Sequence, residues 1–590
     1  MCGIFGYVGH KKTASTVVLR GLTTLEYRGY DSWGIAVGAE KSVPIAIKKK
    51  IGKIGDATVT ELPASTIGFG HTRWATHGGI TDINAHPHLD CSGSIAVIHN
   101  GIIENYEILK QKLIKKGHRF LSQTDTEVAA HLIEEYAKHM LFSKAFQKAF
   151  NEMEGLNAII AFDAQGKTLV AARNGSPLVV GFGTEENFLA SDAVALLPYT
   201  RQVHFLEDDQ MAILSDDKLE IYDIKTGEFV HPKKQRLDWS ISEVVKGKYP
   251  FFMLKEIHEQ PGIIADIAVN NTLQAEKLAL HIKKSYGSYL VGCGTASYAC
   301  LAGSYLFSKI AHRHINWAVG SEFGYHQDFL TDKSLVIALS QSGETMDTLE
   351  AVKKAKEKGV KIFAIVNVVG STLYRMADYK TLISAGTEKS VASTKAFTAT
   401  LAHLTLLSYA LLGDVAMGQK VILLAAKSTK QVLSAKNTDR IRALAKMLKT
   451  REHIYVIGRG LSYPASLETA LKIKEISYIH AEGFAAGELK HGVIALVTQG
   501  TPCIAFLPND ETYGANLAGA MEMKARGGYI IGISYKPHEV FDYYLPVVDA
   551  AQATIIPNVV TAQLLAYYLT IERGFDPDKP RNLAKSVTVR

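Results

Sequence analysis

The sequence contains little cysteine, and its cysteines are not arranged in pairs. The 590 residues include five, Cys2, Cys91, Cys293, Cys300 and Cys503, with no Cys-x-x-Cys spacing among them. An odd number of scattered cysteines argues against a disulfide framework and against a zinc ribbon. The composition therefore favours a reducing cytoplasm.

The sequence also lacks a strong charge bias and any apolar run long enough to span a membrane. Its 65 basic and 58 acidic residues give a net charge of +7, without like-charge blocks or a basic stripe with interleaved aromatics. We therefore expect no nucleic-acid partner and no membrane partner. The most apolar stretch, Leu401–Leu412, is too short for a bilayer and predicts a buried core helix. The start shows no basic region followed by an apolar one, as a signal peptide would.

The chain is too long for one hydrophobic core, and its pattern of predicted helices and strands changes along its length. Residues 1–230 consist mainly of strand-like runs between glycine-rich turns, with helical periodicity at Glu104–Lys116 and Thr126–His139. This pattern predicts an α+β domain built on antiparallel sheets. Residues 231–260 are predicted to be a linker, since 231–252 has no clear period.

An internal repeat organises the rest of the chain. SYLVGCG at 288–294 aligns with IYVIGRG at 454–460, and two further pairs of segments align in the same order at offsets of 167 and 168 residues. Short apolar strands alternate with helices throughout. We predict two α/β subdomains with doubly wound parallel sheets, residues 261–435 and 436–579, followed by a tail, 580–590.

The cysteine at position 2 is a candidate nucleophile. If Met1 is removed, the α-amino group belongs to Cys2, and its pKa of about 7.7–8.0 lies below the thiol pKa of about 8.5. Such an amine can take the thiol proton and return it to a leaving amine. The alternative role of a lone cysteine is that of a small buried apolar residue.

Three further motifs supply groups that such a nucleophile needs. Arg73, in HTRWATHGG, suits an α-carboxylate, and Asn100-Gly101 follows the apolar strand SIAVI, where an amide and a backbone N–H could form an oxyanion hole. Asp125, in SQTDTE, precedes a helix and could hold an ammonium group. The alternatives are a plain turn for Asn100-Gly101 and a helix N-cap for Asp125.

Six motifs in order give residues 1–230 a specific resemblance: MCGIFGYVG, LEYRGYDSWG, GHTRWATHG, NAHPH, HNGIIEN and SQTDTE. Together they resemble the class II glutamine amidotransferases, whose N-terminal-nucleophile fold has αββα layers. The resemblance implies that Cys2 attacks the carboxamide of glutamine and releases ammonia, with Asn100 and Gly101 at the oxyanion and Arg73 and Asp125 at the amino-acid end. It also implies a loop that closes over the site and contains Trp74, Thr76 and His77.

Histidines are frequent in the same region but do not follow a metal-binding spacing. No HExxH or cysteine-rich motif accompanies them, so we predict no metal site. The histidines concerned are His71, His77, His86, His88 and His99.

Hydroxyl-rich loops at strand-to-helix junctions mark the first subdomain. SLVIAL at 334–339 ends in SQSGET at 340–345, directly before a helical segment, and GCGTASY at 292–298 and EKSVASTKAF at 388–397 follow a similar plan. Hydroxyls and backbone N–H groups at a helix N-terminus favour phosphate. A polar loop that merely caps a helix is the alternative, but three such loops favour a phosphorylated ligand.

The second subdomain contributes acid–base groups instead. Lys472 and Glu475 are three residues apart on a predicted helix, GELKHG at 487–492 contains His491, and the tail carries Lys585. A lysine and a glutamate three residues apart on a helix, such as Lys472 and Glu475, usually form an ion pair on the surface. Carboxylate, imidazole and amine groups together suit proton transfer and attack on a carbonyl.

From about residue 250 to Arg590 these motifs resemble the sugar isomerase (SIS) domains of the glucosamine-6-phosphate synthase family. The resemblance implies that Lys585 forms an imine at C2 of the sugar, that Glu475 moves a proton between C1 and C2, and that His491, from the partner in a homodimer, assists ring opening near Lys472. It further implies a phosphate loop, Ser340, Gln341, Ser342 and Thr345, and pocket residues Val391 and Ser393.

One position departs from the family pattern. The chain has Thr295, Ala296 and Ser297 after Cys293-Gly294, where the family has Cys-Gly-Thr-Ser-Tyr, so a phosphate-binding hydroxyl is missing. We expect Thr295 or Ser297 to replace it. The same segment lacks the third glycine of a dinucleotide-binding loop, and no cofactor is predicted.

The predicted function follows from both resemblances: transfer of ammonia from glutamine to fructose 6-phosphate, and isomerisation to glucosamine 6-phosphate, the first step of amino-sugar biosynthesis. Two distant sites imply that ammonia passes through the protein, and Trp74 is the predicted gate. Three alternatives stay open: an amidotransferase acting on another substrate such as phosphoribosyl pyrophosphate, a sugar-phosphate-binding regulator with a vestigial glutaminase, and a hydrolase of amino-sugar phosphates.

Overall fold

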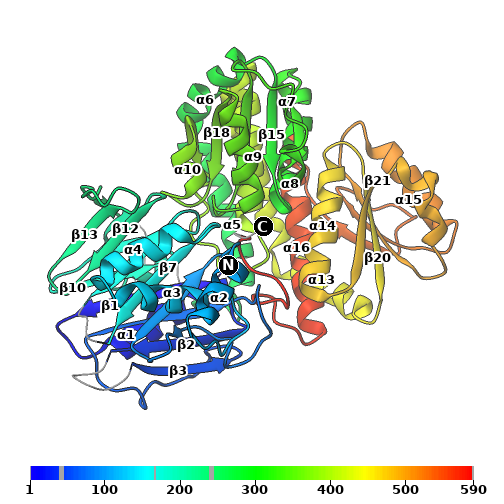
Figure 1. Ribbon diagram of the computed structural model, residues 1–590. Coiled ribbons are helices and arrows are strands. Elements are labelled where there is room, and N and C mark those ends of the chain that lie inside the picture. The colour runs from blue at the N-terminus through cyan, green and yellow to red at the C-terminus, as the bar shows by residue number, and fades with distance from the viewer. Residues whose placement is uncertain (1, 39–44, 165–167, 238–244, 588–590) are drawn as a thin grey trace. The chain divides into compact units, whose positions relative to one another are not determined.

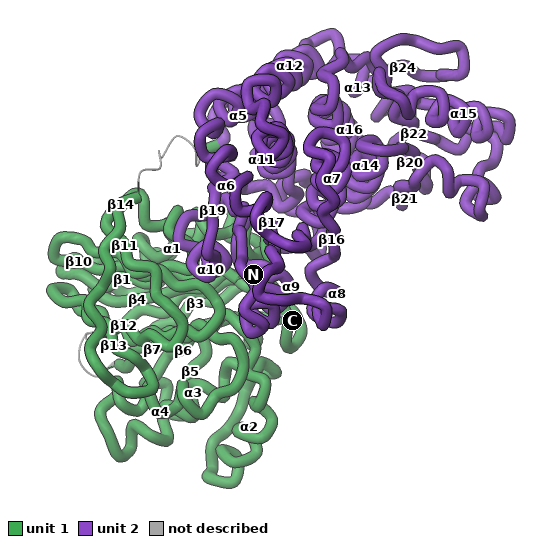
Figure 2. Tube along the Cα trace, turned by 90° about the horizontal axis from the view of Figure 1, so that it is seen from above, with its two compact units in different colours: residues 1–245, 586–590 green, residues 246–585 purple. Residues whose placement is uncertain are grey.

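The computed structural model describes residues 2–38, 45–164, 168–237 and 245–587 (Figure 1). Contacts between residues group the chain into two compact units. Unit 1 comprises residues 1–245 and 586–590, and unit 2 comprises residues 246–585 (Figure 2).

Unit 1 contains two antiparallel sheets. The first has eight strands in the order β14-β11-β9-β10-β1-β4-β2-β3, and the second has six in the order β13-β12-β8-β7-β6-β5. The strands are β1 Gly3–Gly9, β2 Ser32–Val37, β3 Ala46–Ile51, β4 Ile67–Arg73, β5 His88–Leu89, β6 Ile95–Asn100, β7 Ala158–Asp163, β8 Leu169–Arg173, β9 Val179–Phe182, β10 Glu186–Ala190, β11 Gln202–Phe205, β12 Gln210–Leu214, β13 Leu219–Asp223 and β14 Gln235–Arg236.

Helices cover the outer faces of both sheets, so the layers are αββα as predicted. Helix α1 packs on β1 and β4, and helices α3 and α4 pack on strands of the second sheet. The helices of unit 1 are α1 Ala14–Leu25, η1 Glu26–Arg28, α2 Tyr106–Lys115, α3 Glu127–Ala137, α4 Phe142–Glu152 and η2 Ala193–Leu196. Helices α2 and α3 confirm the two segments of helical periodicity.

The alternating direction of apolar side chains along the strands explains these layers. On β1, Phe5 belongs to the core beneath α1, whereas Ile4 and Val8 belong to the core between the sheets. On β6, Val97 contacts the core beneath α3 and α4, whereas Ile98 faces the first sheet. Since successive side chains of a strand point to opposite faces, a strand that is apolar at every position is buried on both sides.

Unit 2 contains two parallel five-stranded sheets with the same topology. Their orders are β16-β15-β17-β18-β19 and β21-β20-β22-β23-β24. The strands are β15 Ser288–Gly292, β16 Asn316–Val319, β17 Leu335–Ser340, β18 Lys361–Val366, β19 Tyr379–Leu382, β20 His453–Gly458, β21 His480–Ala485, β22 Pro502–Leu507, β23 Tyr529–Ser534 and β24 Tyr543–Pro546. Strands β17 and β22 correspond at the predicted offset of 167 residues and β18 and β23 at 168, which confirms the repeat.

One large apolar core joins both halves of unit 2 and includes α11 and α16. The predicted core helix at 401–412 is the second part of α11. The helices are α5 Phe252–Asn270, α6 Thr272–Lys284, α7 Thr295–Ala311, α8 Gly320–Phe323, α9 Met346–Glu357, α10 Thr372–Met376, α11 Lys395–Leu412, α12 Val415–Val432, α13 Ala435–Leu448, α14 Ser462–Ser477, η4 Glu488–His491, η5 Val493–Leu496, α15 Tyr513–Lys524, η6 Ala551–Ala553 and α16 Ile555–Glu572.

Two segments need separate mention. The prediction that no apolar run is long enough to span a membrane is wrong for the stretch Ala551–Glu572, which contains α16 and passes that test by length and composition. However, 89% of its apolar window is buried inside the protein, as in the core helix of a folded domain. The predicted linker, 231–260, contains β14 and the start of α5, and its residues 238–244 lie outside the described residues.

Candidate active sites

Strand alternation brings the predicted glutaminase residues to one end of the sandwich in unit 1. Phe69 of β4 and Ile98 of β6 lie in the core between the sheets. Arg73 and Asn100 have the same parity on those strands. Cys2 precedes β1 with the parity of Ile4, and β1 pairs with β4 through Gly3 and Thr72. The side chains of Cys2, Arg73 and Asn100 therefore face the same space.

The thiol of Cys2 is held by the backbone that follows β4. The Trp74 N–H donates to Sγ at 3.2 Å, and Sγ lies 3.5 Å from the Trp74 carbonyl oxygen. Asp31 fixes this turn, because its carboxylate accepts the Ala75 N–H at 2.9 Å. Burial raises the pKa of the Cys2 thiol, although the Trp74 N–H and Arg73 oppose the shift. The thiol therefore needs a base to become a nucleophile.

Asn100 is oriented by His71 and reaches Cys2. The Asn100 Nδ2 atom donates to the Cys2 carbonyl oxygen at 3.0 Å, and Asn100 Oδ1 lies 3.0 Å from His71 Nε2. That nitrogen is also 3.0 Å from the carbonyl oxygen of His99, so it faces two acceptors and carries the proton. Burial lowers the pKa of His71 to about 3, which keeps the ring neutral. His71 is therefore a positioning residue. From the sequence alone it stood out only as one of several histidines that could bind a metal.

Gly101, next to Asn100, has a backbone conformation that favours glycine. Its φ is +136°, a region that L side chains rarely adopt. A Cβ atom there would lie 2.3 Å from the carbonyl oxygen of Leu156. Any larger residue would therefore move the backbone N–H that follows Asn100.

Arg73 and Asp125 are both fixed through the backbone. The Arg73 guanidinium donates to the carbonyl oxygens of His77, Gly78 and Gly79, which organises the loop after β4. Asp125 Oδ2 accepts the Ile103 N–H at 2.8 Å. The alternative role of Asp125 as a helix N-cap is wrong, because that position before α3 belongs to Thr126.

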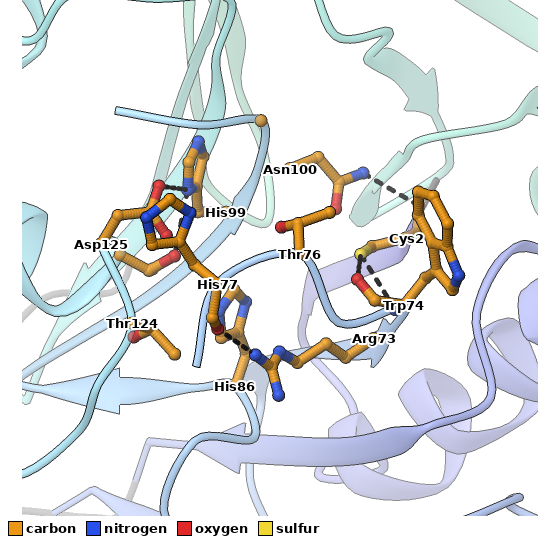
Figure 3. Close-up of a pocket in the computed structure, with 12 residues that line it drawn as sticks. Cys2, Arg73, Trp74, Thr76, His77, His86, His99, Asn100, Thr124 and Asp125 are labelled. Carbon is orange, nitrogen blue, oxygen red and sulfur yellow. Dashed lines mark hydrogen bonds and ion pairs between the residues drawn. The ribbon is translucent and has the colours of Figure 1, made fainter. Parts of the chain in front are cut away.

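These side chains line one pocket (Figure 3). All eight residues predicted for glutamine chemistry lie on its wall: Cys2, Arg73, Trp74, Thr76, His77, Asn100, Gly101 and Asp125. The sequence did not predict the other lining residues, His86, His99, Thr124 and Thr126. A thiol, amide, guanidinium and carboxylate around one cavity can bind an amino acid and attack its side-chain carbonyl.

In unit 2, the loop at 340–345 joins β17 to α9 as predicted. Ser340 Oγ accepts the Gly343 N–H at 3.0 Å and lies 3.0 Å from Thr345 Oγ1, while Ser342 Oγ accepts the Glu344 N–H at 3.1 Å. Gly343 has a φ of +66° and leaves no room for a Cβ atom, which would lie 2.1 Å from Ser371 Oγ. The loop thus gathers hydroxyls at the start of a twelve-residue helix.

A second cluster lies on α14. Lys472 is buried and donates to Glu475 Oε2 at 2.5 Å and to Thr295 Oγ1 at 3.1 Å, and its Nζ lies 3.5 Å from Glu468 Oε1. Burial would lower the pKa of Lys472, but the carboxylates of Glu468 and Glu475 outweigh it and raise the pKa. Burial raises the pKa of Glu468 to about 8. The cluster can therefore hold and move a proton near neutral pH.

A third cluster surrounds Glu388. Its Oε2 atom accepts the Lys585 ammonium at 2.5 Å and the Ser393 hydroxyl at 3.1 Å. Burial would raise the pKa of Glu388, but Lys585 and the backbone N–H groups outweigh it and lower the pKa. The charge of Glu388 also contributes to the raised pKa of Lys472, so the second and third clusters interact electrostatically.

Comparison with known proteins gives matches over the whole chain. The SIS domain family matches residues 281–410 and 447–573, and the glutamine amidotransferase domain family matches residues 71–198. Proteins named glutamine–fructose-6-phosphate aminotransferase (isomerizing) from Pyrococcus horikoshii and Thermococcus kodakarensis are each 45% identical to this chain, with both chains covered completely. This chain belongs to the glutamine–fructose-6-phosphate aminotransferase family.

A solved structure agrees with this aminotransferase family. It is the C-terminal domain of glucosamine-fructose-6-phosphate aminotransferase from Francisella tularensis, which is 33% identical and covers 57% of this chain and 99% of its own, with a TM-score of 0.52. Together with the two parallel sheets, it confirms the doubly wound α/β fold of the C-terminal part.

Not every residue that the family resemblance predicted joins these clusters within one chain. The His491 side chain is exposed in η4, and no hydrogen bond or ion pair among the described residues joins it to Glu475, Lys472 or Lys585. Ser297 is buried within α7, and Val391 is buried beside Ser393. The role of His491 across subunits and the replacement of a phosphate hydroxyl by Thr295 or Ser297 stay predictions.

Glu388 and Glu468 are central to the clusters of unit 2, but the sequence did not identify them. Glu468 could have been found, because it lies four residues before Lys472 and seven before Glu475 on one helix face. Glu388 had no such signal, since its partner Lys585 is 197 residues away.

Proposed function

We propose that this chain transfers ammonia from glutamine to fructose 6-phosphate and isomerises the product to glucosamine 6-phosphate, with release of glutamate. The observation that carries the proposal is the pocket at Cys2, which is lined by the predicted thiol, amide, guanidinium and carboxylate groups. The names of the full-length relatives support the sugar substrate and the isomerisation.

In the first half-reaction, the Cys2 sulfur attacks the side-chain carbonyl carbon of glutamine. Burial raises the thiol pKa, so the thiol needs a base. In this scheme the base is the α-amino group of Cys2, freed by loss of Met1. The oxyanion receives hydrogen bonds from Asn100 Nδ2 and the Gly101 N–H. The carbon–nitrogen bond then breaks, the proton returns to the departing ammonia, and water hydrolyses the thioester to glutamate.

Arg73 and Asp125 bind the amino-acid end of glutamine in this scheme. The guanidinium pairs with the α-carboxylate, and the Asp125 carboxylate pairs with the α-ammonium group. Three backbone carbonyls hold Arg73, so closure of the loop with Trp74, Thr76 and His77 is coupled to the same guanidinium.

In the second half-reaction, the Lys585 amine attacks C2 of the open-chain ketose and water leaves, which gives a lysine imine. Ammonia then replaces the lysine nitrogen at C2, so that free Lys585 is released and the sugar carries an imine at C2. Glu388 Oε2 accepts a hydrogen bond from Lys585 and holds this side chain in place, and the ammonium loses its proton to water before it attacks. Glu475 moves a proton between C1 and C2, and Lys472 holds its carboxylate in place.

The loop at Ser340, Gln341, Ser342 and Thr345 binds the phosphate in this proposal, with Thr295 or Ser297 supplying a further hydroxyl and Val391 and Ser393 lining the sugar pocket. A homodimer places His491 of one subunit at the sugar site of the other. A cytoplasmic location agrees with the five free cysteines of the described chain.

The test is a coupled assay with glutamine and fructose 6-phosphate. We expect glutamate and glucosamine 6-phosphate in equal amounts, and Cys2→Ala should abolish this synthesis while some sugar-phosphate isomerisation remains. Glutamate without an amino sugar would indicate a different acceptor. Saturable sugar-phosphate binding without turnover would indicate a regulator, and release of ammonia from glucosamine 6-phosphate without glutamine would indicate a hydrolase.

A further inference from the structure

Four side chains with metal-binding atoms converge in unit 1, outside the Cys2 pocket. Cys91 follows β5, His118 lies between α2 and α3, and His131 and Glu134 lie one turn apart on α3. One ligand atom of each lies within 4.8 Å of the ligand atoms of the other three. None of the four lines the pocket that contains Cys2.

The distances within this cluster fit a tetrahedral zinc ion. Cys91 Sγ lies 3.6 Å from His118 Nδ1 and 3.5 Å from His131 Nδ1. Zn–S and Zn–N bonds of ordinary length at tetrahedral angles place sulfur and nitrogen about 3.6 Å apart, and nitrogen and oxygen about 3.3 Å apart. The Glu134 Oε2 atom lies 3.0 Å from His118 Nδ1 and 3.4 Å from His131 Nδ1.

The far side of each imidazole faces a carboxylate. His118 Nε2 lies 3.3 Å from Glu135 Oε2, and His131 Nε2 lies 3.5 Å from Glu127 Oε1. A neutral imidazole carries one N–H, and a carboxylate on the Nε2 side favours placing it there. The lone pairs of both Nδ1 atoms then point to the shared centre. A carboxylate behind each ligating histidine is the usual support of a protein metal site.

Hydrogen bonds and ion pairs within the cluster are the alternative to a metal ion, with a protonated His131 that donates to Glu134 and pairs with Glu127. If instead both imidazoles are neutral and carry their proton on Nε2, the thiol hydrogen is the single donor among the four converging atoms. Backbone N–H groups add to the attraction for negative charge, since that of Arg119 donates to Cys91 Sγ at 3.4 Å and that of Cys91 donates to Glu134 Oε2 at 3.2 Å. A cation at the centre satisfies all four groups.

We propose that Cys91, His118, His131 and Glu134 bind one Zn²⁺ ion. A thiolate and a carboxylate balance the two positive charges, and four protein ligands leave no open position, as in structural zinc sites. Both histidines are buried, whereas Cys91 is exposed and gives the ion a path of entry. The sequence predicted no metal site, because the separations of 27, 13 and 3 residues match no local motif.

The ion would join three segments of unit 1. It would tie the turn after β5 and the segment between α2 and α3 to α3 itself. The segment between the helices continues into Thr124 and Asp125 on the Cys2 pocket. Where the proposed function holds, loss of zinc should therefore raise the KM for glutamine more than the KM for fructose 6-phosphate.

The direct test is the zinc content of untagged full-length protein purified from zinc-supplemented cells. We expect about one zinc per chain, most of it lost in Cys91→Ser and in His131→Gln. The control is His453→Ala, because the exposed His453 and His480 have Nδ1 atoms 3.2 Å apart and could bind zinc adventitiously. This variant should retain the zinc of the parent.

Two further measurements do not depend on activity. Replacement of zinc by Co²⁺ should give thiolate-to-cobalt absorption, which Cys91→Ser should remove while the protein stays folded, since this residue is exposed. Glu135→Gln should keep the site but weaken zinc binding by about 10-fold. Absence of zinc and of the cobalt band in the parent, or equal zinc in Cys91→Ser, would overturn the proposal, as would loss of zinc in His453→Ala.

Discussion

Replacement of Asn100 by alanine tests the oxyanion site most selectively. The substitution removes the Nδ2 donor, which in the structure lies 3.0 Å from the Cys2 carbonyl oxygen and is fixed by His71. Loss of one such donor usually costs about 10²–10³ in kcat, or about 2.7–4 kcal/mol of transition-state stabilisation. Because Arg73 and Asp125 still bind the amino-acid end, the KM for glutamine should change little.

Glutamine hydrolysis in steady state is the assay, with sugar-phosphate isomerisation measured on the same preparation. The matched control is Asn105→Ala, which also removes two hydrogen bonds, to Glu152 and Glu154, but lies outside the Cys2 pocket. We expect the control to keep the parent kcat for glutamine. A decrease in kcat of less than about tenfold for Asn100→Ala, or an effect confined to KM, would refute the oxyanion assignment.

The remaining predictions concern unit 2. Glu475→Gln should lower isomerisation and synthesis by about 10²–10⁴-fold and leave glutamine hydrolysis unchanged; equal loss of both activities would contradict its role in proton transfer. Lys585→Arg keeps the charge beside Glu388 but cannot form an imine, so synthesis should vanish while the melting temperature changes little; retained synthesis would exclude the imine. Burial, and then Glu388, raises the pKa of Glu256 from 4.5 to about 8. The stability linked to this raised pKa is fully present below pH about 4.5 and lost as the pH rises through about 8. The melting temperature of the parent should therefore decrease relative to that of Glu256→Gln as the pH rises from about 5 to about 8, and an unchanged difference over this range would contradict the shift.

Most of the fold could be predicted from the sequence, because the apolar strands and the internal repeat follow regular patterns. Strands with long apolar runs, such as β1 and the first four residues of β6, are buried between two layers. The nearly constant offset between β17 and β22 and between β18 and β23 identified a repeat without any knowledge of the contacts. Ser340 lies at the end of β17 before α9, where the strand–loop–helix pattern placed it. These features depend on spacing along the chain, which the sequence displays directly.

What the sequence could not show depends on contacts between distant residues. His71 orients Asn100 across two different sheets, and Glu388 meets Lys585 from 197 residues away. Cys91 reaches His131 only after β5 and α3 pack together. Such partners share no periodicity, so their chemistry emerges only when the tertiary structure sets the distances.

The central claim is that the Cys2 thiol acts with its own α-amino group as base. The most direct measurement is the intact mass of purified enzyme together with its rate of glutamine-dependent glucosamine 6-phosphate synthesis. We predict that active enzyme has lost Met1 and begins at Cys2. Full activity in protein that retains Met1 would contradict the account.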